Sequence, residues 1–261
     1  MALMKIATWN VNSLRVRLPH VLDWLKTEQP DVLALQEIKL VDELFPHDAL
    51  REAGYACVVS GQPTYNGVAV LARQSMSAPM SEVVTDIPGF DDPQRRVLAV
   101  TLDDVRVVNL YVVNGEAVGS EKYAYKLAWL DALSAWLAEE STRHPKLVVL
   151  GDFNIAPDDR DVFDPAKWEG KILCSEPERA ALARLHELGL VDVFRQFEQE
   201  EKTFSWWDYR MNGFKRNLGL RIDLILASRS MAEQCRASYV DKTPRGWERP
   251  SDHAPVIAEF A

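Results

Sequence analysis

Cysteine is scarce in this sequence of 261 residues, which holds only Cys57, Cys174 and Cys235. The three are odd in number, lie far apart and form no Cys-x-x-Cys pair, so neither a disulfide framework nor a cysteine-rich zinc site is expected. This pattern predicts a protein of the reducing cytoplasm.

Long hydrophobic runs are also missing, because no apolar stretch approaches the ~20 residues that a bilayer-spanning helix needs. The first residues, 1–5, lack the charged segment, apolar run and small-residue cleavage site of a secretory signal. We therefore expect neither a membrane segment nor export.

Basic residues do not outnumber acidic ones: 30 Lys and Arg stand against 39 Asp and Glu, a formal net charge of -9. Modules that bind nucleic acid by bulk charge usually carry the opposite excess, so the balance argues against that class. It is compatible with an enzyme that gathers carboxylates around a cation while a local basic surface holds a phosphate backbone.

Internal repeats, low-complexity segments and Gly/Ser-rich linkers are absent too. Residues 85–96 are predicted to be a loop, and residues 156–170, with two prolines and four aspartates, form a loop of a length that is often functional. The sequence therefore predicts one domain over residues 1–261.

What the sequence does hold is a series of short runs rich in Val, Ile and Leu, whose length and β-branching are typical of buried strands. They are residues 5–9, 32–35, 67–71, 105–113, 147–150, 222–226 and 255–258. Helical spacing of leucines covers 123–140 and 177–188, and 18–27 is also predicted to be a helix, with Pro19 in its first turn. Strands with helices between them predict an α/β fold of sheets covered by helices.

Several of these apolar runs end in acids and amides. The residues concerned are Asn10, Asn12, Gln36, Glu37, Asp152, Asn154 and Asp223, and Ser251, Asp252 and His253 stand just before the final run. Taken singly, a strand-terminal Asp or Asn is typical of a turn. Carboxylates are rarely buried unless they are paired or bind a metal, so their repetition predicts a shared cleft that holds a cation. Oxygen donors with few thiols suit Mg²⁺, or Mn²⁺ as a substitute, better than zinc.

His253 taken alone is more typical of an ordinary core or surface histidine. Beside Asp252, and with Asp223 at another strand end, it is predicted to be an imidazole oriented by a carboxylate. Nucleophilic catalysis by a Ser-His-Asp set is disfavoured, because the sequence has no Gly-x-Ser-x-Gly elbow.

Five blocks of the sequence, in order, resemble the exonuclease III family of DNA-repair nucleases, within the endonuclease/exonuclease/phosphatase superfamily. They are residues 9–12 (WNVN), 35–37 (LQE), 151–155 (GDFNI), 220–223 (LRID) and 251–255 (SDHAP). The stretches 205–210 (SWWDYR) and 219–223 (GLRID) favour the DNA-repair branch over lipid and inositol phosphatases. The resemblance covers the whole chain and implies a DNase I-like four-layer α/β sandwich, in which two mixed sheets pack face to face with helices outside.

The resemblance also implies a set of ligands for Mg²⁺ at one edge of this sandwich. Glu37 would be the main ligand with Asn10 beside it, and Asp252 is a second candidate ligand. Whether one ion or two act stays open.

The same resemblance implies a catalytic set. Asp152 would orient or deprotonate the attacking water, and Asn154 would hydrogen-bond the phosphate. Asp223 would hold His253, and Tyr111 would lie near the leaving oxygen. Phosphodiester hydrolysis suits these residue types, because a divalent ion, an amide and an imidazole stabilise the charge that grows on the phosphoryl and leaving oxygens.

Contacts to DNA are predicted from several further residues. Trp206 and Trp207 can offer flat faces to a sugar or base, although a core position is equally typical of either. Asn12, Asn114 and Arg95 lie in stretches that resemble the family. Candidates for contacts to the DNA backbone are Lys122, Lys126, Lys215, Arg216, Arg245 and Arg249.

Two departures from the family pattern affect the predicted activity. Val113 and Ser13 stand where many members have Pro and Gly, both near the expected cleft. We expect a monomeric, Mg²⁺-dependent phosphodiesterase for duplex DNA whose action on 3′ ends is at least as strong as incision at abasic sites. The alternatives are a phosphatase or phosphodiesterase for a small or lipid substrate, and a catalytically silent DNA-binding module.

Overall fold

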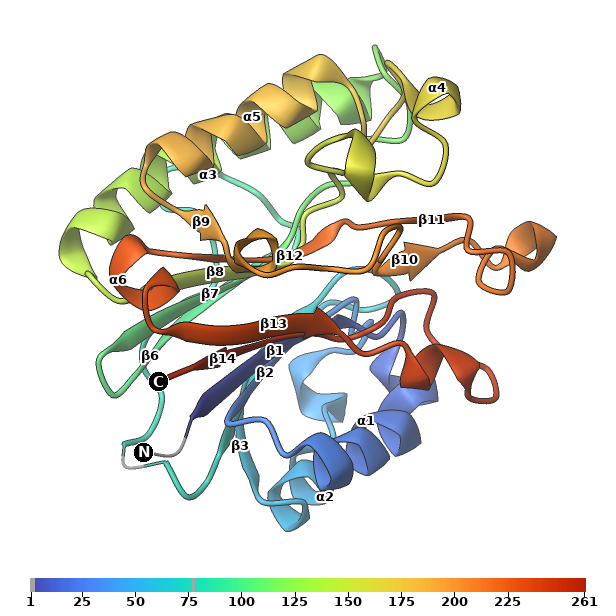
Figure 1. Ribbon diagram of the computed structural model, residues 1–261. Coiled ribbons are helices and arrows are strands. Elements are labelled where there is room, and N and C mark those ends of the chain that lie inside the picture. The colour runs from blue at the N-terminus through green and yellow to red at the C-terminus, as the bar shows by residue number, and fades with distance from the viewer. Residues whose placement is uncertain (1–2, 77) are drawn as a thin grey trace.

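The computed structural model describes residues 3–76 and 78–261, which form two six-stranded mixed sheets packed face to face (Figure 1). The strand order in the first sheet is β13 (Cys235–Val240), β14 (Val256–Phe260), β1 (Met4–Asn10), β2 (Val32–Gln36), β4 (Val68–Arg73) and β3 (Tyr55–Ser60). The order in the second is β5 (Ser81–Val84), β6 (Val97–Leu102), β7 (Val105–Tyr111), β8 (Leu147–Asp152), β12 (Asp223–Ala227) and β9 (Val191–Asp192). A separate ribbon pairs β10 (Trp206–Trp207) with β11 (Gly219–Leu220).

Helices cover the outer faces of both sheets. The α-helices are α1 (Leu14–Glu28), α2 (His47–Glu52), α3 (Glu121–Arg143), α4 (Pro165–Trp168), α5 (Glu176–Glu187) and α6 (Arg229–Ala232). Helices α1 and α2 lie outside the first sheet, and α3 and α5 lie outside the second (Figure 1). The predicted four-layer α/β sandwich is thereby confirmed.

Most of the main elements follow the predicted apolar runs, but several differ. Helix α1 begins at Leu14, so Pro19 lies inside the helix rather than in its first turn, and α4 lies within the predicted loop 156–170; both correct the predictions. Strands β3 and β13, at the two ends of the first sheet, are only partly buried and were not predicted, and neither were β6 and the short strands β5, β9, β10 and β11.

The hydrophobic core has three layers. Side chains between the two sheets include Ile6, Leu150 and Ile225. A second layer packs α3 and α5 on the second sheet, and a third packs α1 on the first. Since side chains alternate along a strand, every second residue of each central strand faces the other sheet.

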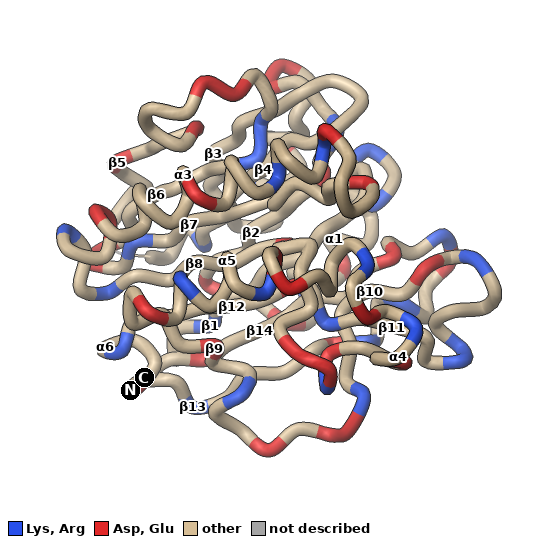
Figure 2. Tube along the Cα trace, turned by 90° about the horizontal axis from the view of Figure 1, so that it is seen from above, with Lys and Arg blue, Asp and Glu red and all other residues tan. Residues whose placement is uncertain are grey.

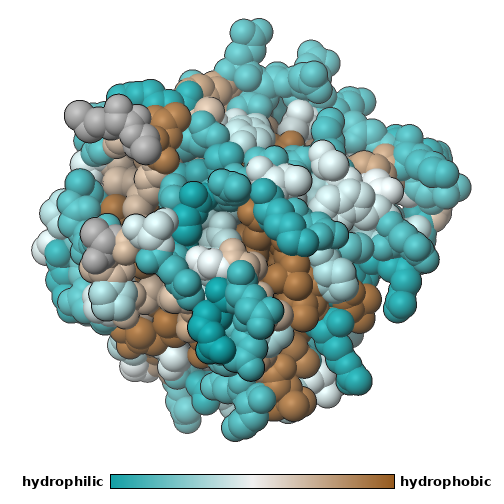
Figure 3. All heavy atoms as spheres, turned by 90° about the horizontal axis from the view of Figure 1, so that it is seen from below, coloured by the Kyte–Doolittle hydropathy of each residue, from teal (hydrophilic) through white to brown (hydrophobic). Residues whose placement is uncertain are grey.

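The surface is mixed in charge. Seen from above, acidic and basic positions are interspersed, and several basic ones lie in the loops beside β10 and β11 (Figure 2). The view from below shows a mainly hydrophilic face with interspersed apolar groups (Figure 3). None of the helices in the described part of the chain is long and apolar enough to cross a membrane.

Candidate active site

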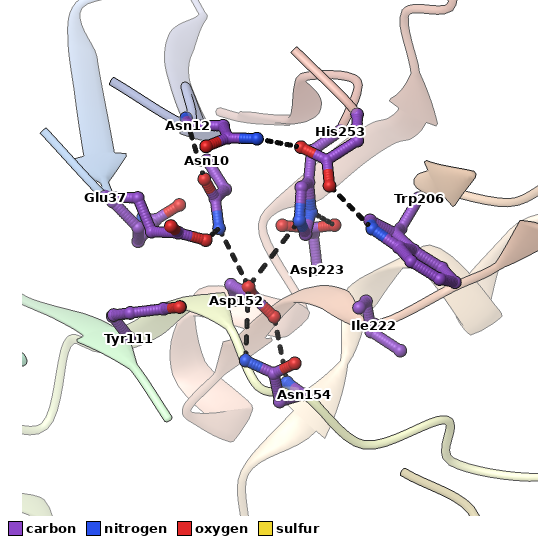
Figure 4. A network of polar contacts seen from close by, with 12 residues as sticks. Asn10, Asn12, Glu37, Tyr111, Asp152, Asn154, Trp206, Ile222, Asp223 and His253 are labelled. Atoms are coloured by element: carbon purple, nitrogen blue, oxygen red, sulfur yellow. Dashed lines mark hydrogen bonds and ion pairs between the residues drawn. The ribbon is translucent and has the colours of Figure 1, made fainter. Parts of the chain in front are cut away.

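The alternation along the central strands brings the predicted polar residues to one place. Ile6 and Leu150 face the space between the sheets, so Asn10 and Asp152, an even number of residues further on, face it as well. Asp152 is the register partner of Tyr111 on one side and of Asp223 on the other. One edge of the space between the sheets therefore collects side chains from both sheets (Figure 4).

Gly151 sets the close approach of β7 and β8 at this edge. Its φ of 138° lies in a region that L side chains rarely adopt, and a Cβ there would meet the Leu110 carbonyl oxygen at 2.0 Å. Glycine at position 151 therefore lets β8 lie close to β7, with Asp152 directly after it.

Asp152 is the centre of the site and is almost fully buried. Its Oδ2 accepts from Asn10 Nδ2 at 2.9 Å and from Asn154 Nδ2 at 3.3 Å, and its Oδ1 accepts from the Asn154 backbone N–H at 2.9 Å. Burial raises the pKa of Asp152 to about 7, with the Asp223 and Glu37 carboxylates adding to the effect and His253 opposing it. A carboxylate with a pKa near neutrality is suited to accept a proton.

The candidate cation site is centred on Glu37, whose carboxylate lies beside Asp152 and His253: one N or O atom from each of the three lies within 4.8 Å of the others. Glu37 follows β2 with a φ of 50° and accepts from Asn10 Nδ2 at 2.9 Å. Lys39 Nζ lies 2.9 Å from the other Glu37 oxygen, so the carboxylate already has a positive partner. The paired carboxylate oxygens fit a hard divalent cation.

Asn10 contacts Glu37 and Asp152 through its amide nitrogen rather than its oxygen. The oxygen accepts from the Asn12 backbone N–H at 3.0 Å, and this fixed donor sets the orientation of the amide. Asn10 therefore ties the two carboxylates together, and its predicted part as a metal ligand stays a prediction.

His253 is held from behind by Asp223. Its Nδ1–H donates to Asp223 Oδ2 at 2.8 Å, and that oxygen also accepts from Ser205 Oγ at 2.6 Å. The Nε2 atom lies 3.8 Å from Asp152 Oδ2. Burial disfavours the charged imidazole, but the Asp223 and Asp152 carboxylates outweigh it and raise the pKa of His253 to about 10. The predicted contact between Asp223 and His253 is present.

Asp252 uses both carboxylate oxygens within the protein. Oδ1 accepts from Asn12 Nδ2 at 2.9 Å and Oδ2 accepts from Trp206 Nε1 at 3.0 Å. Asp252 lies outside the group of close ligand atoms formed by the described residues, and its predicted part as a second metal ligand stays a prediction.

Tyr111 lies at the edge of the site, partly exposed, beneath the guanidinium of Arg96 at 4.9 Å from the ring centroid. Burial raises the pKa of Tyr111 well above its usual value, and the carboxylates of Glu37 and Asp152 act in the same direction. The phenol therefore stays protonated and can donate a hydrogen bond.

Three residues predicted to contact DNA are buried. Trp207 is fully buried and donates its indole N–H to Asn217 at 3.0 Å. Lys126 is fully buried against Glu178, and Arg245 lies beneath the Trp207, Tyr209 and Phe214 rings with 6% exposure. Neither the Trp207 ring nor the Lys126 and Arg245 cations can meet a DNA strand, which corrects these three predictions.

The remaining candidates for DNA contact lie at or near the surface. Asn114 and Lys122 are exposed, and Lys122 lies 3.0 Å from Glu116. Arg95 forms a half-exposed ion pair with Asp86 at 3.0 Å. Three further basic residues are exposed: Lys215 and Arg216 between β10 and β11, and Arg249 shortly before Ser251.

Sequence reasoning missed Lys39 and Ser205 as parts of the site, whereas Ser251 belongs to the predicted polar set. Ser251 Oγ donates to the Asn10 carbonyl oxygen at 2.7 Å, and Ser205 Oγ accepts from the backbone N–H groups of Ile222 and Asp223. The position of Lys39, two residues after Glu37, is the signal that could have found it.

Comparison with known proteins places this arrangement in a family. Residues 7–253 match the Endonuclease/Exonuclease/phosphatase family. The chain is 37% identical to exodeoxyribonuclease III of Haemophilus influenzae, over 98% of this chain and all of that protein, and 33% identical to an exodeoxyribonuclease of Bacillus subtilis, over 97% and 98%. The chain therefore belongs to the Endonuclease/Exonuclease/phosphatase family. Within it, the relatives are of the exodeoxyribonuclease III type, so the predicted class of phosphodiester-bond hydrolase is confirmed.

Solved structures agree with this placement. The structure described as the 3′-5′ exonuclease (NExo) from Neisseria meningitidis is 53% identical with a TM-score of 0.95 and covers 98% of this chain and 99% of its own. A structure described as a variant of the 3′ phosphatase NExo from Neisseria, bound to product DNA hairpin, is 52% identical, with a TM-score of 0.95 and 99% of both chains covered. An AP endonuclease from Archaeoglobus fulgidus is 38% identical, with a TM-score of 0.92 and 98% and 99% covered.

Proposed function

We propose that this chain is a Mg²⁺-dependent DNA-repair nuclease that removes nucleotides or blocking groups from 3′ ends of duplex DNA and also incises at abasic sites. The observation that carries the proposal is the convergence of Glu37, Asp152 and His253 within 4.8 Å at the sheet edge, with amides on both sides of Asp152. A module that only binds DNA does not need buried carboxylates beside an imidazole, because burying like charges together is unfavourable.

In the proposed reaction Asp152 takes a proton from the attacking water. Its pKa of about 7 suits a base at neutral pH, and the Asn10 amide and the Asn154 backbone N–H orient the carboxylate. The Asn154 N–H that reaches Asp152 at 3.3 Å is the one available to a phosphoryl oxygen.

His253 and Tyr111 stabilise negative charge in this scheme. Asp223 holds the His253 ring so that Nε2–H points to the place where a phosphoryl oxygen would lie, and Tyr111 donates its phenol proton towards the leaving oxygen. Preorganised donors of this kind act without reorienting during the reaction.

Glu37, the predicted main ligand, would hold the Mg²⁺ ion, with Mn²⁺ as a substitute. A bound divalent cation supplies charge neutralisation at the phosphoryl oxygens. Lys39 Nζ, 2.9 Å from Glu37 Oε2, holds that carboxylate in place in the site.

Preference for 3′ ends is supported by the solved structures described as a 3′-5′ exonuclease and a 3′ phosphatase, which share over half of their residues with this chain. Trp206 supplies the ring face that a frayed terminal nucleotide or a sugar without its base can stack on, since unstacking costs least where pairing is already lost. Action as a monomer in the cytoplasm stays a prediction.

The test is cleavage of two matched, end-labelled duplexes, one with a recessed 3′ end and one with an internal abasic analogue, with Mg²⁺ and with EDTA. We expect cleavage only with Mg²⁺, and a kcat/KM on the recessed end at least equal to that on the abasic duplex. A large advantage for the abasic duplex would reverse the order of activities. Binding without cleavage in Mg²⁺ would support the silent DNA-binding module, and cleavage of only small phosphate esters would support the phosphatase.

A further inference from the structure

A buried lysine behind the site has no part in the proposed chemistry. Lys126, in α3, has 0% side-chain exposure, and so does its ion-pair partner Glu178, in α5. Charged side chains are almost never fully buried unless their partners are fixed, so this pair requires an explanation.

All three ammonium hydrogens of Lys126 are used. One goes to Glu178, one to the Asn154 carbonyl oxygen at 2.7 Å and one to the Asn114 carbonyl oxygen at 3.2 Å. An ammonium group has three donors, and here two of them hold the main chain of residues whose side chains line the site.

Glu178 is equally satisfied. It accepts from the backbone N–H of Leu173 and of Ser175, each at 3.0 Å, and from Ser175 Oγ at 2.6 Å, which caps the start of α5. The pair therefore joins four segments: α3, the start of α5, the turn after β8 and the loop after β7.

The loop after β7 is shaped to lie against Lys126. Gly115 has a φ of 92°, and a Cβ there would lie 3.0 Å from Lys126 Cδ and 2.8 Å from Ile172 Cδ1. Asn154 also has a positive φ, 49°, and Asn114 Nδ2 donates to its side-chain oxygen at 3.0 Å. Gly115 adopts its conformation without strain, whereas that of Asn154 is sparsely populated for a residue other than glycine and is supported by these contacts.

We propose that Lys126, neutralised by Glu178, is a positioning residue that holds the Asn154 and Asn114 amides in the geometry that the phosphate requires. The part of the inference that concerns catalysis rests on the proposed function. The part that concerns loop geometry does not.

The variants remove the pair without leaving a lone buried charge. Lys126→Met with Glu178→Gln takes away both charges and keeps the shapes, and Lys126→Gln with Glu178→Gln, which also leaves no charge, is prepared in parallel in case the first double variant does not fold. The matched control is Arg106→Met with Glu140→Gln, since that pair is also at most 2% exposed and involves the other end of α3.

The first measurement is amide hydrogen exchange without DNA. Exchange in peptides that cover residues 112–116 and 153–156 should rise at least tenfold in the Lys126 variant and stay unchanged in the control, once both are compared at equal global stability. Equal exchange in the variant and the control would overturn the inference whether or not the protein is a nuclease.

The second measurement is a double-mutant cycle with Asn154→Ala on the recessed duplex. Loss of the pair should lower kcat about 10²-fold with little change in KM, because misplacing a reacting group by about 1 Å has that cost. In the Asn154→Ala background the same change should cost less than about threefold. An equal loss of kcat in both backgrounds would show that Lys126 acts on stability alone. If the wild-type protein cleaved no DNA, the proposed function would be wrong instead.

Discussion

Oδ2 of Asp223 accepts hydrogen bonds from two donors at once, His253 Nδ1 at 2.8 Å and Ser205 Oγ at 2.6 Å. The carboxylate is fully buried and holds the His253 ring from behind. The relationship makes Asp223 and His253 a single unit, and several consequences can be measured.

His253→Asn should slow DNA cleavage by about 10²-fold or more, because an oriented donor at the phosphoryl oxygen is lost. Asp223→Asn should slow it through the same imidazole, so the double variant should be little slower than the slower single variant. The measurement is kcat/KM on the recessed duplex for all four proteins. If the two single losses in kcat/KM simply multiplied in the double variant, Asp223 and His253 would not act as a unit.

The His253 ring should stay protonated far above neutrality in the metal-free protein. Its pKa of about 10 exceeds the ordinary 6.5, so the imidazolium contributes stability that is fully present below pH 6.5 and is lost as the pH rises through about 10. In EDTA, the gap in unfolding free energy between wild type and Asp223→Asn should therefore be widest below pH 6.5. A ring titration by NMR that ends near pH 7 would contradict this assignment.

Glu37→Ala should raise the Mg²⁺ concentration that gives half-maximal cleavage, because one hard oxygen ligand is removed. The control is Glu116→Ala, which removes an exposed carboxylate that pairs with Lys122. If Glu37→Ala shows the Mg²⁺ titration of wild type, Glu37 is not a ligand.

Trp206 and Trp207 form a matched pair of neighbours with opposite surroundings. Trp207→Ala removes a fully buried ring and should cost about 3–5 kcal/mol of unfolding free energy. Trp206→Ala should cost much less stability and should instead lower kcat/KM on duplex DNA. Urea unfolding and kinetics on the recessed duplex check both, and a reversed pattern would exclude Trp206 as the stacking face.

The sequence predicts the centre of the site better than its supports. Glu37, Asp152 and Asp223 stand at the ends of apolar runs. Strands that pack face to face in two sheets bring such terminal residues to a common edge. Strand β13 was missed because its register shifts between Cys235 and Ala237 and its alternation is broken there.

Lys126 shows where reasoning from residue type fails. A lysine on a helix is usually solvated, yet its spacing from the buried Tyr123 and Leu130 puts position 126 on the inward face of α3. Its partner lies 52 residues away in another helix, and no local pattern shows such a contact. Helical periodicity identifies the face, but only the packing of α3 against α5 identifies the ion pair.

The central claim is tested most directly with Asp152→Asn, a change that removes a charge and a proton acceptor but keeps the shape of the side chain. DNA binding by the variant is measured by fluorescence anisotropy, and cleavage of the end-labelled recessed duplex is measured in Mg²⁺ beside wild type. The account predicts that the variant binds the duplex and cleaves it at least ~10²-fold more slowly, the least that a general base contributes. Cleavage by Asp152→Asn at the wild-type rate would contradict it.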